Sequence, residues 1–278
     1  MKKTRRIKIF KEFFIQLIYV SIGILIIFPI LYALSVSFME NKDVLTKPIN
    51  LLPPSATLDN YSIALTRTPL LRYLLNSTIV SLISTISRII MGSMAAYAFS
   101  FYEFRGKKAL FALAMATMMI PPDVLIIANY GTISKLGLIN TYFGMCSIFL
   151  VSANNIFLLR QNFLSYSTSL RDAAYIDGCG TIRFFTKILI PTSSPILFTL
   201  FISSFVSVWN QYVWPMLVTK ENEMRTVQVG VAMLKDRESS IFAPIMAAVI
   251  IALLPTLIIF ILFQRKIVAG MMDGSVKA

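Results

Sequence analysis

The chain has 278 residues, of which 56% are hydrophobic and 14% are charged, and its formal net charge is +13. An ordinary soluble domain has about 25% charged residues, so this composition excludes that class and predicts an all-α polytopic membrane protein. The basic residues stand at the ends of apolar runs and are not interleaved with aromatic residues. This distribution favours a role in membrane orientation over nucleic-acid binding.

Six apolar runs are long enough to cross a hydrocarbon core about 30 Å thick. The expected transmembrane helices cover residues 14–38, 76–102, 109–130, 142–159, 195–217 and 243–263. The first run is longer than the apolar part of a signal peptide and has no Ala-x-Ala sequence after it, so we expect it to remain as a span. The chain then divides into an N-terminal segment (1–13), one membrane domain (14–263) and a C-terminal tail (264–278).

The distribution of Lys and Arg predicts the orientation of these spans. Of the 26 basic residues, 16 fall at the two termini or in the loops that follow the second and fourth spans, 9 fall in the other loops, and Arg88 lies inside the second span. Basic residues accumulate in cytoplasmic loops. Both termini and the loop at 160–191 are therefore predicted to be cytoplasmic.

The loops on the opposite side differ in composition. The loop at 39–75 contains Pro53-Pro54 and is expected to be an extended strap rather than a helix, and residues 131–141 are expected to form a small hairpin. Residues 218–242 carry both charge signs around a more apolar stretch at 227–234. Trp209, Tyr212 and Trp214 end the fifth span, where a position in the interfacial aromatic belt is favoured over sugar stacking.

The sequence has no group of residues suited to catalysis. Histidine is absent, and Gly106-Lys107-Lys108 lacks the upstream glycine and the hydroxyl residue of a nucleotide-binding loop. Cys146 is expected within a span and Cys179 in a cytoplasmic loop, so they should not pair. We therefore expect neither an enzyme nor a metal site, and no cofactor bound by this chain.

The cytoplasmic loop at 160–191 contains a polar cassette, Asp172-Ala173-Ala174-Tyr175-Ile176-Asp177-Gly178, followed after nine residues by Ile188 and then Pro191. Ala173 and Ala174 precede Asp177 by four and three residues, so a helix would place small residues and carboxylates on one side. Gly178 could adopt the left-handed conformation that ends such a helix. A loop helix can contain Ala, Asp and Gly for no functional reason, but the complete spacing makes chance a poor explanation.

This spacing resembles the EAA loop in the membrane subunits of binding-protein-dependent ABC importers, although Asp172 stands where that loop usually has Glu. Residues 95–99, 104–108, 120–122, 136–142, 264–266 and 274–277 also resemble the carbohydrate importer permeases represented by the second maltose permease subunit. The stretch at 209–215 is most similar to the glycerol-3-phosphate importer permeases of that group.

The resemblance implies a type I ABC importer permease in a bacterial cell membrane, in contact with membrane lipid. It further implies a second permease subunit, two ATP-binding subunits that hold ATP and Mg²⁺, and an extracytoplasmic solute-binding protein. The solute would be a carbohydrate or a polyol phosphate. Contact with the ATPase would be made by Asp172, Ala173, Ala174, Asp177, Gly178, Ile188 and Pro191.

Polar residues within the spans are candidates for a solute path, namely Arg88, Asn154, Asn155, Ser207, Asn210 and Gln211. Their neutral hydrogen-bonding groups would suit a hydroxyl-rich solute. For the neutral residues the alternative, which we favour, is hydrogen bonding between helices. For Arg88 the favoured alternative is that its long side chain reaches interhelical carbonyls.

The resemblance also implies a site for the solute-binding protein in the loop at 218–242, at Val229, Gly230, Val231, Ala232 and Met233. The alternative is a solvated loop without a partner.

Two other functions compete with an importer subunit. One is a self-sufficient secondary transporter, which the absence of inverted repeats and intramembrane carboxylates disfavours. The other is a membrane scaffold, which would not require the cassette's spacing.

Overall fold

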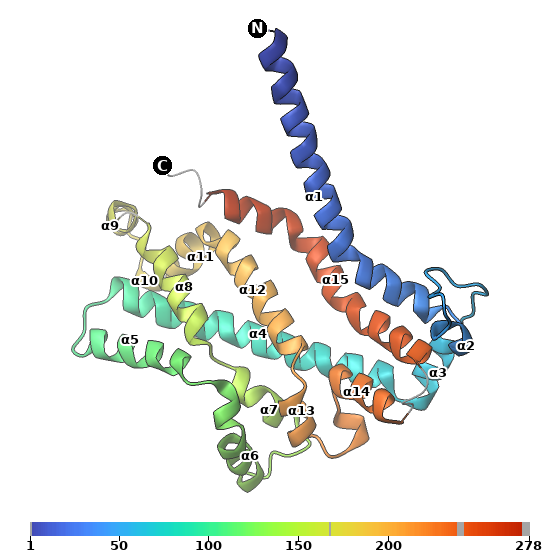
Figure 1. Cartoon of the computed structure of the whole chain (residues 1–278). Helices are drawn as coiled ribbons and strands as arrows, with labels where there is room; N and C mark the ends of the chain where they lie inside the picture. Colours follow the sequence, from blue (N-terminus) through green and yellow to red (C-terminus); the bar gives the residue numbers. More distant parts are fainter. Residues whose placement is uncertain (1, 167, 238–241, 274–278) are drawn as a thin grey trace. The chain divides into compact units, whose positions relative to one another are not determined.

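The structure is a computed structural model that describes residues 2–166, 168–237 and 242–273 of the chain. Within these ranges all regular elements are helical, apart from one isolated antiparallel bridge between Met39 and Ala56 (Figure 1). The all-α prediction is confirmed.

The α-helices are α1 (Lys2–Ser37), α2 (Asn41–Val44), α3 (Asp59–Arg67), α4 (Leu70–Phe101), α5 (Lys107–Ala116), α6 (Ile126–Lys135), α7 (Tyr142–Cys146), α8 (Ala153–Leu164), α9 (Thr168–Ile176), α10 (Thr181–Phe184), α11 (Ile190–Thr192), α12 (Ser194–Trp209), α13 (Val213–Val218), α14 (Val227–Arg237) and α15 (Phe242–Asp273). Between them lie the 3₁₀ turns η1 (Thr117–Met119), η2 (Pro122–Leu125), η3 (Ser147–Phe149) and η5 (Asn222–Met224), and the π-helical segment η4 (Phe185–Leu189).

Three uninterrupted helices are long and apolar enough to cross a membrane: residues 12–37 of α1, all of α4, and residues 242–264 of α15. Three more candidates are pairs of helical segments bent at a short break, by 92° after residue 119, by 49° after residue 149 and by 76° after residue 192. The described residues therefore contain three candidate spans, or up to six if each bent pair is one span. They follow the predicted spans in order.

The first two breaks have a local cause or a local support. Pro121 and Pro122 stand at the first, where the missing amide hydrogens and the crowded pyrrolidine rings prevent a continuous helix. At the second, the carbonyls of Phe149 and Leu150 accept hydrogen bonds from Arg88 Nε (2.7 Å) and Ser87 Oγ (2.9 Å). Backbone carbonyls within a membrane need hydrogen-bond partners. Side chains of α4 donate the hydrogen bonds that the interrupted helix cannot.

One compact unit of the chain comprises Met1–Leu70 and Val231–Leu253. In it the side-chain amide of Asn60 donates to the carbonyl oxygens of Ser37 (3.0 Å) and Met39 (2.7 Å). The Tyr61 hydroxyl lies 2.8 Å from Ser37 Oγ. Because Asn60 and Tyr61 belong to α3, the prediction of an extended strap over residues 39–75 is wrong beyond its proline-rich part.

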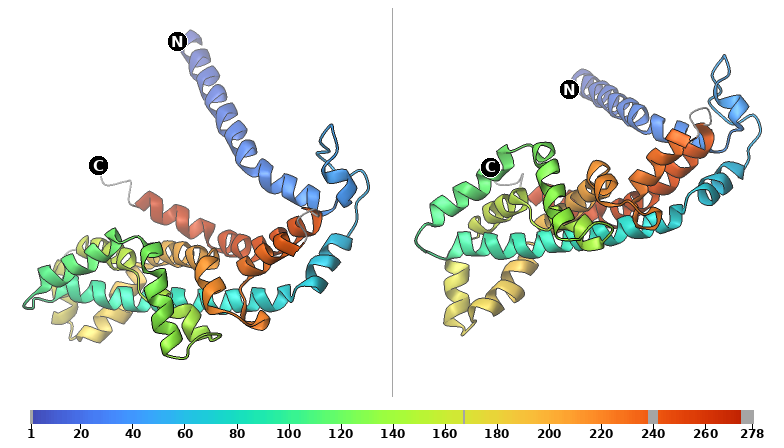
Figure 2. Two further views of the ribbon diagram at one scale, coloured as in Figure 1. Left: turned by 60° about the horizontal axis from the view of Figure 1, so that its bottom comes forward. Right: turned by 90° about the horizontal axis from the view of Figure 1, so that it is seen from below.

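The other unit comprises Leu71–Gly230 and Leu254–Ala278, and α4 runs along it (Figure 2). Two clusters of buried side chains form its core. The first cluster consists of Val80, Ile133, Met145, Cys146, Phe149, Val208, Trp214 and Val218. The second cluster consists of Ala96, Tyr97, Leu159, Phe163, Ala174, Phe184, Leu189 and Leu200.

One further loop prediction needs correction. Residues 131–141 do not form a hairpin, because they continue α6 to Lys135 and then turn through Gly137 (φ 68°) and Asn140 (φ 58°). The loop at 218–242 contains η5 and α14, and its residues 238–241 lie outside the described residues. Asn76 of α4 fixes this loop, since its buried amide donates to the carbonyls of Glu223 (2.7 Å) and Arg225 (2.9 Å).

Candidate functional site

The cassette forms helix α9, and the chain leaves it through a Schellman motif. Gly178 has φ 73°, its N–H donates to the Tyr175 carbonyl (3.0 Å), and the Cys179 N–H donates to the Ala174 carbonyl (2.9 Å). These bonds satisfy the last carbonyls of α9. The predicted helix with a left-handed glycine at its end is therefore confirmed.

The two alanines of the cassette lie in different environments. Ala173, like Asp172 and Asp177, is exposed, whereas Ala174 is buried in the second cluster. The expectation that both alanines share the exposed side is wrong, because Ala174 faces the buried side chains of the second cluster, whereas its neighbours on both sides are exposed. Close approach by a partner is therefore possible at Ala173, while the small size of Ala174 serves packing within the chain.

Helix α9 is tied to the end of α4. The Arg171 guanidinium donates to the Phe101 carbonyl (3.5 Å) and lies 5.9 Å from the centroid of the Phe101 ring. Tyr175 packs on Phe184, with ring centroids 6.2 Å apart. These contacts attach α9 to the end of α4 and to α10.

The exposed residues of this segment include large apolar side chains besides Asp172, Ala173 and Asp177. Ile176 is 86% exposed, Ile182 of α10 is 79% exposed, and Tyr175 is 42% exposed. The sequence analysis missed these residues as contacts, although three large apolar residues in a loop outside the predicted spans were visible there. Tyr175 and Ile176 lie outside the candidate spans, so their exposure favours a protein-interaction surface, whereas Ile182 belongs to a candidate span.

Ile188 and Pro191, which follow the cassette, lie in different environments. Ile188 packs against the second cluster, the same cluster that contains Ala174. Pro191 is exposed and lines an apolar groove of about 360 Å³ with Phe198, Phe201 and other residues. The structure thus joins Ile188 to α9 through the core but places Pro191 on a different surface.

A polar cavity of about 600 Å³ lies between α4, η2, α6 and the break after α12. Four of the six predicted solute-path residues line it: Arg88, Ser207, Asn210 and Gln211. Asp123, Asn129 and Tyr212 also line it and were not predicted as solute contacts. They come from the second half of the bent third span and from the break after α12, so only the fold brings them to the cavity.

Arg88 serves a structural purpose in this cavity wall. Its Nε donates to the Phe149 carbonyl (2.7 Å), and its guanidinium carbon lies 5.6 Å from the centroid of the Phe149 ring. The favoured reading of Arg88, that it reaches interhelical carbonyls, agrees with this geometry. The side chain nevertheless borders the cavity, so a solute there would meet a cation.

The two asparagines of the fourth span do not line the cavity. Asn155 is buried and donates to Ser204 Oγ of α12 (3.1 Å), which is a bond between two helices. Asn154 is exposed. Asn155 therefore forms a hydrogen bond between two helices, as the favoured alternative predicted, and does not line the cavity.

The segment proposed for binding-protein contact lies on α14 and is partly covered by the chain itself. Val229 and Gly230 are buried, whereas Val231, Ala232 and Met233 are half-buried. The structure therefore offers only the latter three residues to a partner.

The aromatic belt expected at the end of the fifth span is absent at Trp209 and Trp214, which are 2% and 1% exposed. Trp214 Nε1 donates to the Met145 carbonyl (3.2 Å).

Comparison with known proteins places this geometry in a family. Residues 88–273, which include the cavity and α9, match the model for the binding-protein-dependent transport system inner membrane component. The chain belongs to this family. The resemblance inferred from the cassette and the other motifs is thereby confirmed.

Relatives of this family member match over nearly the whole chain. It is 33% identical to the sn-glycerol-3-phosphate transport system permease protein UgpE of Rhizobium meliloti (90% of this chain, 92% of that protein). It is 31% identical to the arabinooligosaccharides transport system permease protein AraQ of Halalkalibacterium halodurans (93% and 94%). A subunit in the crystal structure of a bacterial ABC transporter involved in the import of alginate has the same fold, with a TM-score of 0.79 and 23% identity over 93% of this chain and 96% of that one.

Proposed function

We propose that this chain is the non-catalytic permease subunit of an ATP-driven, binding-protein-dependent importer in a bacterial cell membrane, and that a separate ATPase drives it through α9. The observation that carries the proposal is the exposed Ala173 and Ile176 surface on a helix tied to the end of α4. A partner bound to this surface would move the spans together with α9. This role requires α9 and both termini to be cytoplasmic, as the basic residues predict.

The partners in this proposal are a second permease subunit, two ATP-binding subunits that carry ATP and Mg²⁺, and a solute-binding protein. Helix α1 supports the need for a further subunit or lipid, because none of its most apolar window is buried within the chain. The half-buried side of α14, at Val231, Ala232 and Met233, is the surface we assign to the solute-binding protein.

We place the solute in the carbohydrate and polyol-phosphate class. The relatives named for sn-glycerol-3-phosphate and arabinooligosaccharides support this class. The cavity supports it as well, because Asn129, Ser207, Asn210 and Gln211 provide neutral donors and acceptors for hydroxyl groups. Arg88 and Asp123 add one cation and one carboxylate to the wall.

Reconstitution tests the proposal directly. Proteoliposomes that contain the complete complex should accumulate the solute only when ATP, Mg²⁺ and the loaded binding protein are supplied, because this chain has no nucleotide-binding loop of its own. Uptake driven by an ion gradient in vesicles with this chain alone would instead establish a secondary transporter. An assembled complex that carried none of the solutes bound by its binding protein would favour a scaffold.

A further inference from the structure

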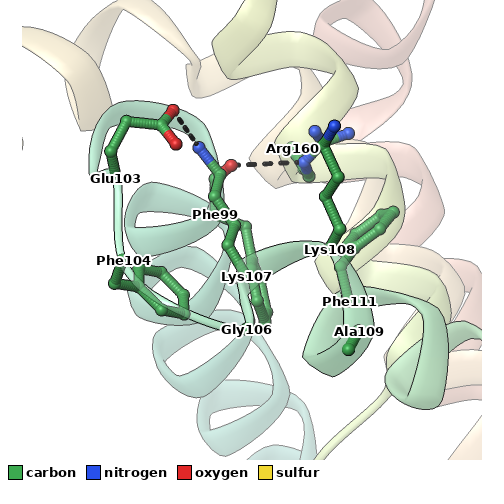
Figure 3. A pocket seen from close by; sticks show the side chains of 9 residues that line it. All are labelled: Phe99, Glu103, Phe104, Gly106, Lys107, Lys108, Ala109, Phe111 and Arg160. Atoms are coloured by element: carbon green, nitrogen blue, oxygen red, sulfur yellow. Dashed lines mark hydrogen bonds and ion pairs between the residues drawn. The ribbon is translucent and has the colours of Figure 1, made fainter.

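A second cavity, separate from the one lined by Arg88, lies where α4 ends and α5 begins (Figure 3). Its volume is about 650 Å³, and its wall combines the end of α4, the turn before α5 and one residue of α8. Three cations reach it: Lys107 and Lys108 from the first turn of α5, and Arg160 from α8. Neither the solute path nor the coupling segment uses these residues.

One of the three cations is neutralised locally. Lys107 Nζ lies 2.8 Å from Glu103 Oε1, and the Lys107 ammonium lowers the pKa of the Glu103 carboxyl, which therefore stays ionised at neutral pH. Within the described part of the chain, neither Lys108 nor Arg160 forms an ion pair, although the charge of Lys108 also acts on Glu103, so three cations of the cavity face one carboxylate. The cavity thus has an uncompensated positive charge shared by two side chains from different helices.

Arg160 is held in place by groups that leave its outer nitrogens available. Its Nε donates to the Phe99 carbonyl (3.4 Å), and its guanidinium carbon lies 4.4 Å from the centroid of the Phe111 ring. In Figure 3 the ends of the Arg160 and Lys108 side chains extend in the same direction. A guanidinium fixed on a ring, with an ammonium group on the same side, suits an anion that has several acceptor oxygens.

The backbone at the start of α5 adds to the positive electrostatic potential in this cavity. Gly106 lines the cavity in the left-handed conformation (φ 83°) and starts α5 without a side-chain cap. The N–H groups of the first turn have no partner inside their own helix, and the helix dipole is positive at this end. Cationic side chains and the helix end therefore favour the same ligand, a phosphate.

The surroundings indicate how such a phosphate would arrive. The cavity lies at the end of two helical segments that contribute to candidate spans, and it is lined by Phe99, Phe104 and Phe111. On α5, Leu110 and Leu113 are 51% and 65% exposed. Apolar side chains that continue directly from a basic cavity suit acyl chains below a headgroup, and basic pockets between membrane helices bind anionic lipid headgroups.

We infer that the cavity of Lys108 and Arg160 binds the phosphate of an anionic phospholipid in the leaflet that faces α9. Its occupant would tie α5 to α8 at the end of the membrane domain to which α9 is attached. The inference does not depend on the solute or on the ATPase, so it can fail while the proposed function stands.

Native mass spectrometry of the purified full-length chain tests the site, with phosphatidylglycerol and phosphatidylcholine offered at equal concentration. We expect retained phosphatidylglycerol in preference to phosphatidylcholine, and about fivefold less of it for Lys108→Gln. Arg105→Gln is the matched control, because it removes the same charge from the same turn but does not line the cavity. Arg160→Lys keeps the charge and should also lower retention, since an ammonium cannot form the forked contact.

Three results would overturn the inference. Equal retention of the two lipids, which both carry a phosphate, would exclude selection for a headgroup with net negative charge. Equal losses for Lys108→Gln and Arg105→Gln would show general charge attraction instead of a cavity. Unchanged retention of phosphatidylglycerol by Lys108→Gln and by Arg160→Lys would place the bound lipid elsewhere on the chain.

Discussion

Ala173→Arg should reduce both solute uptake and binding-protein-stimulated ATP hydrolysis of the reconstituted complex by about tenfold, which corresponds to about 1.4 kcal/mol. Ala173 is exposed on α9, so the larger side chain does not disturb this chain. It would stand between two backbones that must approach closely, and it would add a charge to a surface that includes Ile176, 86% exposed. The variant should still insert and fold, as size-exclusion chromatography and a thermal shift assay would show.

Two matched variants separate coupling from folding. Gln161→Arg adds an arginine at an exposed position of α8 and should leave uptake unchanged. Ala174→Arg changes the neighbouring alanine, which is buried in the second cluster, and should lower the yield of folded chain because a charge would enter an apolar core. Full activity of Ala173→Arg, with the protein demonstrably assembled, would remove α9 from the coupling mechanism.

Gly230→Val should destabilise the folded chain by about 3 kcal/mol, or about 5 to 10 °C in Tm. A Cβ atom at Gly230 would overlap Cδ2 of Tyr73, and the Tyr73 ring is buried in the packing between α4 and α14. The start of α14 is also fixed to α4, because the Val227 N–H donates to Ser77 Oγ (2.8 Å). The ring cannot move aside without disturbing this packing, so α14 must shift.

Ala232→Val is the control for this variant, since it adds the same β-branched side chain to the same helix at a half-buried position. Its Tm should change little, and any loss of stimulation by the solute-binding protein would then report contact at α14 directly. A Tm for Gly230→Val equal to that of the wild type would contradict the close packing of α14 on Tyr73.

The sequence predicted the order and helical nature of the candidate spans, because long apolar runs have few alternatives in a membrane. It also predicted α9 and its end, since Gly178 can take a positive φ without strain. It did not predict which alanine faces outward. That choice depends on Tyr97, Phe163 and Phe184, which meet Ala174 only in the folded chain.

The cavity lined by Arg88 also depends on contacts that the sequence alone does not reveal. Proline marks the break in the third span, but the break after Phe149 has no proline and depends on hydrogen bonds from Ser87 and Arg88, more than sixty residues earlier. Trp214 looked like an interfacial residue because of its position at the end of an apolar run. In the fold its indole donates to Met145 and fills the core, a distinction that hydropathy alone cannot make.

Site-specific photo-crosslinking in intact membranes measures the central claim most directly. A photo-reactive residue at Ile176 should form an adduct with the ATP-binding subunit, whereas one at Ile127, which is 84% exposed on α6, should not. An ATPase adduct from Ile176 alone is the result this account predicts. An ATPase adduct from Ile127 together with none from Ile176 would contradict it.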